Sequence, residues 1–184
     1  MIDPADKSVL LDIARHSIEH GLQYARPLIP DVHNYSEKLQ EITASFVTLK
    51  IHGQLRGCIG SLEARQPLVM DVAENAYAAA FRDPRFPPVS ESEFTQLEYH
   101  ISLLTPAEPL QFRDEADLIS QLQPNVDGLV LEDGRHRGTF LPSVWESLPD
   151  RKQFLQQLKL KAGLSPDYWS DTVKVSRYTV EDVE

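Results

Sequence analysis

Residues 55–60 form the part of this 184-residue chain whose side chains could do chemistry. They include Cys58, which is the only cysteine, and Arg56 two positions before it. Side chains in a strand alternate between faces, so Arg56 and Cys58 are predicted to share a face, about 6.6 Å apart at ~3.3 Å per residue. A guanidinium beside a thiol favours the thiolate, which is the nucleophilic form. The pair predicts a reactive or ligand-binding thiol.

Two glycines accompany this pair and bear on the same prediction. Gly57 and Gly60 weaken a strand and add no packing, which is typical of places where a ligand or another backbone comes close. The functional interpretation is a small pocket floored by these glycines. The structural interpretation makes Cys58 a small buried hydrophobic residue, as free cysteines often are. Both interpretations are open at this point.

A nucleophilic cysteine normally requires a base within hydrogen-bond reach. His52 and His100 are the candidates, but nothing in the sequence aims either side chain at Cys58. Asp83, Arg85 and Phe86 follow the best predicted helix on a proline-stiffened loop. They could line a cleft, or they could serve structure, with Asp83 pairing with an arginine and Phe86 filling the core.

Metal and nucleotide sites have little support in the sequence. Of six histidines, only His16 and His20 stand four residues apart, and one cysteine cannot build a thiolate cage. Glycine patterns of dinucleotide-binding and P-loop proteins are absent. We therefore predict no metal and no cofactor.

The composition limits the partners and the compartment. A formal charge of -10 opposes binding to nucleic acid and to anionic membranes, although Arg135 and Arg137 form a local basic cluster. A single cysteine excludes an intrachain disulfide, which favours a reducing compartment. Neither a signal sequence nor an apolar run near the ~18 residues of a membrane span is found. These features predict a cytoplasmic protein without membrane contact.

The first half of the chain predicts a helix, a hairpin and a second helix. Asp3 is the expected N-cap of a first helix that Gly21 ends. Alternation predicts a strand over 44–51, a tight turn at 52–54 and a returning strand over 55–59. A four-residue apolar repeat predicts a helix from Pro67 to about Asp83.

The second half adds further hairpin and helix signals. Ser90 and Glu93 form a capping-box pattern, and residues 97–103 alternate as a strand. Asp133 and Gly134 indicate a hairpin turn, and a last helix is expected from 150 to 163. Hairpins without regular strand–helix alternation favour an α+β class with antiparallel sheets. We predict one domain of residues 1–184.

Residues 55–60, which read LRGCIG, resemble the hallmark hexapeptide of the AMMECR family, which includes AmmeMemoRadiSam system protein A. DPRFPP at 83–88 and ISLLT at 101–105 agree with the same family in order and spacing. So do Gly128-Leu129, Phe140-Leu141-Pro142, KAGL at 161–164 and Trp169. The resemblance covers about residues 40–180.

The resemblance implies two unequal lobes with antiparallel sheets flanked by helices and a cleft between them. The larger lobe would contain both chain ends, and part of the middle of the chain would form the smaller one. On the matched positions we take Arg56 and Cys58 as candidate catalytic residues. The candidate ligand-binding residues are Gly57, Gly60, Asp83, Arg85 and Ser102.

No activity is attached to the family, but its members imply a pathway shared with a Memo-like protein and a radical SAM protein. The favoured hypothesis is an enzyme-like or small-molecule-binding protein that uses Arg56 and Cys58. The alternative is a non-catalytic adaptor that docks a partner protein, for example through the hairpin of Arg135 and Arg137. RNA binding is the third and weakest hypothesis. The sequence does not decide whether a reaction occurs.

Overall fold

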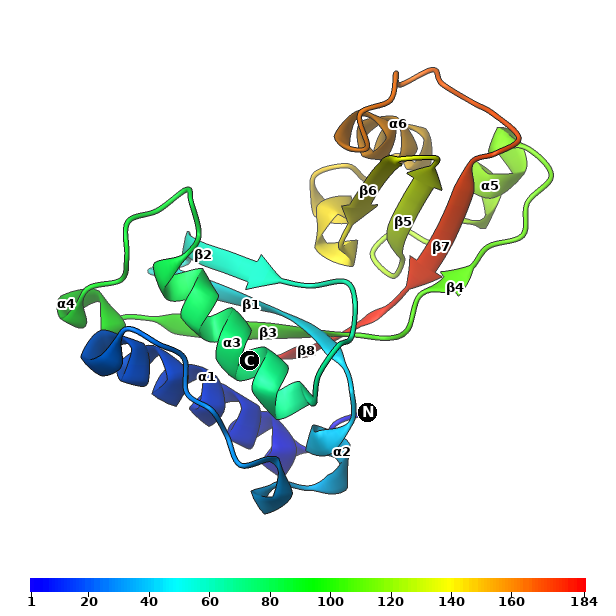
Figure 1. Ribbon diagram of the computed structural model, residues 1–184. Coiled ribbons are helices and arrows are strands. Elements are labelled where there is room, and N and C mark those ends of the chain that lie inside the picture. The colour runs from blue at the N-terminus through cyan, green and yellow to red at the C-terminus, as the bar shows by residue number, and fades with distance from the viewer. The chain divides into compact units, whose positions relative to one another are not determined.

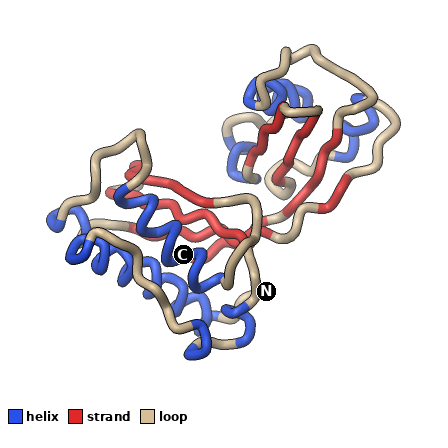
Figure 2. The backbone as a smooth tube through the Cα atoms, in the orientation of Figure 1, coloured by secondary structure: helices blue, strands red, loops and turns tan.

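The computed structural model describes residues 1–184 and divides the chain into two compact units. The first unit contains residues 1–104 and 181–184, and the second contains residues 105–180. Each unit has one four-stranded sheet, and antiparallel pairing predominates in both sheets. The predicted α+β class is confirmed (Figure 2). None of the helices is both long and apolar enough to cross a membrane.

The first unit combines a sheet of order β2-β1-β3-β8 with helices on one of its faces (Figure 1). Its helical elements are α1 (Pro4–Tyr24), η1 (Val32–Asn34), α2 (Glu37–Gln40), α3 (Leu68–Phe81) and α4 (Glu91–Phe94). Its strands are β1 (Ala44–Ile51), β2 (Gln54–Gly60), β3 (Glu98–Leu104) and β8 (Val180–Val183). The last strand joins residues from the end of the chain to a sheet built near its beginning.

The hairpin that carries the LRGCIG segment forms where the sequence predicts it. Ile51 pairs with Gln54, and the two turn residues His52 and Gly53 have φ of 52° and 72°. Such a two-residue turn with positive φ at both positions matches the twist of the strands that it joins. β2 therefore lies beside β1, at one edge of the sheet.

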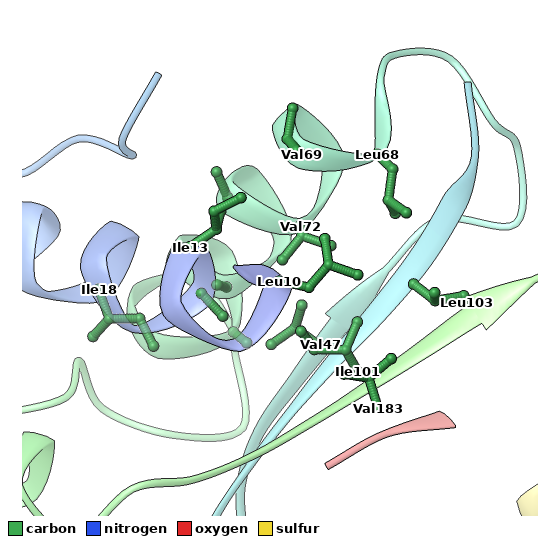
Figure 3. Packing of buried hydrophobic residues seen from close by; sticks show 14 of the residues in the cluster. Leu10, Ile13, Ile18, Val47, Leu68, Val69, Val72, Ile101, Leu103 and Val183 are labelled. Atoms are coloured by element: carbon green, nitrogen blue, oxygen red, sulfur yellow. The ribbon is translucent and has the colours of Figure 1, made fainter. Parts of the chain in front are cut away.

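Helices α1 and α3 cover one face of this sheet and supply most of its core. Figure 3 shows Leu10 and Ile13 of α1 and Val72 of α3 lying beside Val47 and Ile101 of the sheet. These five residues are between 0% and 3% exposed. Because Val47 and Ile101 point to the helices, their strand neighbours Thr48 and His100 point to the opposite face. We call that opposite side the open face of the first sheet.

A buried polar network fixes α3 to the start of β1. The Asp71 carboxylate accepts hydrogen bonds from the Ser45 backbone N–H at 2.9 Å and from Asn75 Nδ2 at 2.9 Å. Burial raises the pKa of Asp71, and the hydrogen bonds from Ser45 and Gln66 oppose that shift. The Ser45 carbonyl in turn accepts from the Ser61 N–H at 3.2 Å, which holds the end of the LRGCIG strand.

The first helix does not end at Gly21, so that prediction was wrong. α1 continues to Tyr24, and its C-cap is Ala25 in a left-handed conformation with φ of 54°. Gly21 serves packing instead, because a Cβ there would lie 2.4 Å from the Phe81 ring and 2.7 Å from the Tyr77 ring. The glycine lets α1 approach α3 closely.

The second unit is organised around a sheet of order β4-β7-β5-β6. Its elements are β4 (Glu108–Pro109), α5 (Glu115–Gln121), β5 (Gly128–Asp133), β6 (His136–Phe140), η2 (Pro142–Glu146), α6 (Arg151–Lys161) and β7 (Lys174–Tyr178). Trp145 stacks on Phe154 with ring centroids 3.6 Å apart in its core. The predicted hairpin turn after Asp133 is present, and Gly163 has φ of 83° after the last helix.

The Gly21 packing leads to a first prediction. Gly21→Ala should lower the free energy of unfolding by about 1–3 kcal/mol, because overpacking outweighs the gain of about 1 kcal/mol in helix propensity. Chemical denaturation measures this difference. The control is Gln23→Ala at an exposed position of the same helix. A stabilised Gly21→Ala variant would contradict the packing role.

Candidate functional site

The hexapeptide strand contains a β-bulge that sets the direction of its side chains. Thr48 pairs with Cys58, Leu49 with Gly57 and Lys50 with Leu55, so Arg56 is an extra residue without a partner in β1. Regular alternation therefore fails at this position. The structure does not bring the Arg56 guanidinium and the Cys58 thiol together, and the prediction that they share a face was wrong.

Arg56 is instead buried and fastens α4 and the preceding loop to β2. Its side chain binds Glu93 through both carboxylate oxygens, with Nε–Oε1 at 2.8 Å and Nη2–Oε2 at 3.1 Å. Nη2 also donates to the Pro87 carbonyl at 2.8 Å. The hydrogen bonds from Arg56 lower the pKa of Glu93 to about 2, with further help from Ser90. The capping box of Ser90 and Glu93 is confirmed. Glu93 therefore both caps α4 and pairs with Arg56.

Asp83 connects the loop after α3 to Cys58. This carboxylate is 4% exposed, and its Oδ2 accepts a hydrogen bond from the Cys58 backbone N–H at 2.9 Å. It also binds Arg85, through Nη2 at 2.7 Å and Nε at 3.0 Å. These bonds, with that from Arg85 the largest influence, hold the pKa of Asp83 well below its usual range. Asp83 is thus a buried anion that orients both the Cys58 backbone and the Arg85 side chain.

Arg85 is the guanidinium that lies near the cysteine. Its Nη2 donates to the Cys58 carbonyl at 3.5 Å, while the side chain as a whole is 54% exposed. The pKa of Arg85 is raised, chiefly by its side-chain hydrogen bonds to Asp83. Arg85 therefore occupies the position near Cys58 that was predicted for Arg56.

The Cys58 side chain is half-buried and has a hydroxyl partner. Thr48 Oγ1 donates to Cys58 Sγ at 3.2 Å, directly across the β1–β2 ladder. Sequence reasoning missed Thr48 because an unbulged hairpin would pair it with Gly57. It also missed the non-local hydrogen bonds that Arg56 donates to Glu93.

Protein atoms fill the space beside the two glycines of the motif. A Cβ at Gly57 would lie 2.1 Å from the Ala79 carbonyl oxygen, so α3 packs directly on the strand backbone. A Cβ at Gly60 would lie 2.4 Å from the Phe46 ring and from the Ser45 carbonyl oxygen. Close approach of another part of the protein accounts for both glycines. Contact of either glycine with a ligand stays a prediction.

The two histidines considered as bases for Cys58 lie elsewhere. His52 is in the hairpin turn, and His100 lies opposite Thr48 on β3, two strands away from Cys58. Two strand spacings correspond to roughly 10 Å, which is beyond hydrogen-bond reach. His100 instead contacts Glu184 through Nδ1 at 2.7 Å and Asp182 through Nε2 at 3.1 Å.

Ser102 is separated from the Cys58 cluster. Its hydroxyl donates to Asp182 Oδ1 at 2.9 Å and lies 3.3 Å from His100 Nε2. Ser102 thus belongs to a polar cluster that links β3 to the end of the chain. No group of three histidine, cysteine or carboxylate side chains has the geometry to hold a metal ion.

The fold and this site together define a class of protein. It is an α+β protein with two antiparallel sheets. The edge strand β2 carries a cysteine whose backbone N–H is bound by a carboxylate that is paired with a guanidinium. A sequence profile of the AMMECR1 family matches residues 11–183. The chain belongs to the AMMECR1 family.

Relatives from archaea and bacteria agree with this assignment. A protein of Methanothermobacter thermautotrophicus is 38% identical over 179 residues, covering 94% of this chain and 90% of its own length. A protein of Thermotoga maritima is 40% identical over 166 residues, covering 89% of this chain and 90% of its own length. The crystal structure of an uncharacterized protein from Pyrococcus horikoshii superposes with a TM-score of 0.85 at 34% identity. That match covers 95% of this chain and 88% of the other.

The Arg56–Glu93 pair leads to a second prediction. A lowered carboxylate pKa contributes stability above the unfolded value of 4.5 and loses it as the pH falls towards about 2. Glu93→Gln should remove this contribution and flatten the acid side of the stability curve. Because the carboxylate is 32% exposed, we expect a change on the order of 1 kcal/mol between pH 5 and pH 3.

Urea denaturation across this pH range measures the effect. Glu91→Gln, in the same short helix and without an ion pair, is the matched control. If Glu93→Gln and wild type lose stability in parallel between pH 5 and pH 3, the pair is not linked to folding.

Proposed function

We propose that the protein binds a small anionic molecule beside Cys58, with Arg85 as the anchor for the anion and the thiol as the contacting or reacting group. The observation that carries this proposal is the way in which Asp83 holds Arg85. A carboxylate that is 4% exposed commits both oxygens to a guanidinium that is 54% exposed. Burying an anion is costly unless it is paired, and here the pairing also fixes a cation at the surface.

The donors of Arg85 are distributed in a way that supports anion binding. Nε and Nη2 bind Asp83, whereas Nη1 makes no hydrogen bond within the protein. An oriented guanidinium can bind a carboxylate or phosphate with little loss of side-chain entropy, because its rotamer is already fixed. A ligand held there would lie beside Cys58, whose backbone carbonyl Arg85 contacts and whose side chain is half-buried.

The role of Arg56 changes under this proposal. Its guanidinium is engaged with Glu93 and Pro87, so it supports the loop that carries Asp83 and Arg85. Arg56 is therefore a positioning residue here. The resemblance to AmmeMemoRadiSam system protein A extends the proposal to a cytoplasmic pathway shared with a Memo-like protein and a radical SAM protein.

The adaptor and RNA-binding alternatives have less support. Arg137, in the hairpin proposed as a docking surface, binds Glu132 with Nε–Oε1 at 3.1 Å, which neutralises part of the basic cluster. The formal charge of -10 opposes polyanion binding by the chain as a whole. No observation favours either alternative over the Cys58 site.

A pair of alkylating reagents tests the proposal on the only thiol of the chain. Iodoacetate and iodoacetamide both transfer a carbon to sulfur with loss of iodide and of the thiol proton, but only iodoacetate is an anion. We expect Arg85→Gln to lower the iodoacetate rate relative to the iodoacetamide rate by about fivefold at low salt. The ratio cancels any change in the intrinsic reactivity of the thiol.

Arg82→Gln is the matched control, because it removes the same charge at the C-cap of α3, where Arg82 lies over the Tyr77 ring and forms no ion pair with Asp83. An equal ratio in wild type and Arg85→Gln would show that Arg85 does not attract anions to Cys58. A thiol that neither reagent labels in the folded protein would also reject the proposal.

A further inference from the structure

A cavity of about 310 Å³ lies in the first unit, and neither Cys58 nor Arg85 is among the residues that line it. It is lined by Lys50, Glu98, Tyr99, His100 and Glu184. Leu49, Ile101 and Val183 belong to the core cluster under α1 and α3. The alternating neighbours Lys50, His100 and Glu184 therefore lie on the open face of the sheet. Lys50 comes from β1, three lining residues come from β3, and Glu184 directly follows the end of β8.

Lys50 is a cation that forms no ion pair with the carboxylate opposite it in the sheet. It lies directly opposite Glu98 in the β1–β3 register, where opposite charges on one face normally pair. The Glu98 carboxylate instead accepts a hydrogen bond from the Gly53 backbone N–H at 3.2 Å. No ion pair within the protein engages the exposed Lys50 ammonium. The cavity thus offers a donor group to a ligand anion.

The other wall of the cavity is acidic. Glu184 Oε1 accepts from His100 Nδ1 at 2.7 Å, and Glu98 Oε1 accepts from Gly53. Each carboxylate keeps its second oxygen for another donor. Asp182, bound to His100 Nε2 at 3.1 Å, adds a further negative charge on this face. The carboxylates therefore offer acceptor groups to a ligand cation.

We propose that this cavity binds a small zwitterion with one carboxylate and one primary ammonium group, of the size of an amino acid. The ligand carboxylate binds Lys50, and its ammonium group binds the free oxygens of Glu98 and Glu184. A simple anion would meet the acidic wall, and a simple cation would meet Lys50. A cavity of about 310 Å³ is at the lower end of the range for ligand sites, which suits a small molecule. This site goes beyond the proposed function and uses none of its residues.

A series of ω-amino acids from glycine to 6-aminohexanoate tests the site, because the series varies only the distance between the two charges. Titration of the full-length, ¹⁵N-labelled protein at low salt is followed by NMR. We expect saturable shifts in the backbone amides of Lys50, Tyr99 and His100, with one chain length binding best. Butyrate and butylamine, which carry one charge each, should bind at least about tenfold more weakly.

Variants give the proposal its controls. Lys50→Met keeps most of the aliphatic side chain and should weaken the best zwitterion by about tenfold, and Glu98→Gln should weaken it by a similar factor. Lys174→Met, at an exposed lysine of the second unit, should leave the affinity unchanged. Cys58→Ser and Arg85→Gln should also leave it unchanged, which separates this site from the proposed function.

Three outcomes would overturn the inference. The first is that no chain length causes saturable shifts at Lys50, Tyr99 and His100. The second is that the zwitterions and the singly charged compounds bind equally well. The third is that Lys50→Met binds the best zwitterion with unchanged affinity. Loss of binding in Cys58→Ser or Arg85→Gln with retained folding would place the ligand at the other site and would equally reject this one.

Discussion

The hydrogen bonds of the Asp83 carboxylate are the interaction on which the cysteine site depends. Asp83 follows α3 in the chain, yet it accepts the backbone N–H of Cys58, 25 residues earlier. The same carboxylate orients Arg85. Because it is 4% exposed, solvent does not compete strongly for its oxygens. The end of the main helix, the edge strand and the surface guanidinium therefore form one connected unit, and Arg56 reinforces it from the other side through Glu93 and Pro87.

Elements specified by local signals were predictable from the sequence. The turn at His52 and Gly53, the helix before Asp83 and the capping box of Ser90 and Glu93 all formed where residue type and spacing indicate. In each case the determining contacts lie within a few positions along the chain. Gly21 shows the limit of such reasoning, since its neighbours Tyr77 and Phe81 come from a different helix and override its usual role as a helix stop.

The site was predictable in its residues but not in its pairings. Cys58, Asp83 and Arg85 were all selected from the sequence, and the structure brings them together. The partner of the thiol was misjudged, because a bulge of one residue shifts the register and turns Arg56 towards Glu93. A bulge has no reliable sequence signal other than a nearby glycine, and Gly57 could be explained equally well by ligand contact. The contact of Thr48 with Cys58 and the contacts of the acidic residues at the end of β8 with His100 depend on non-local strand pairing. The alternation of side chains in the sequence does not specify that pairing.

Because β2 lies at the edge of its sheet, the Asp83–Arg85 pair also affects whether another strand can add there. An edge strand displays unpaired N–H and C=O groups that can template the addition of a strand from another molecule. At Cys58 the carboxylate occupies the N–H and the guanidinium lies at the C=O, so both groups are already engaged. A charged side chain at this point also deters a neighbouring strand. The same pair that connects Arg85 to Cys58 therefore also blocks the addition of a strand at this point of the edge.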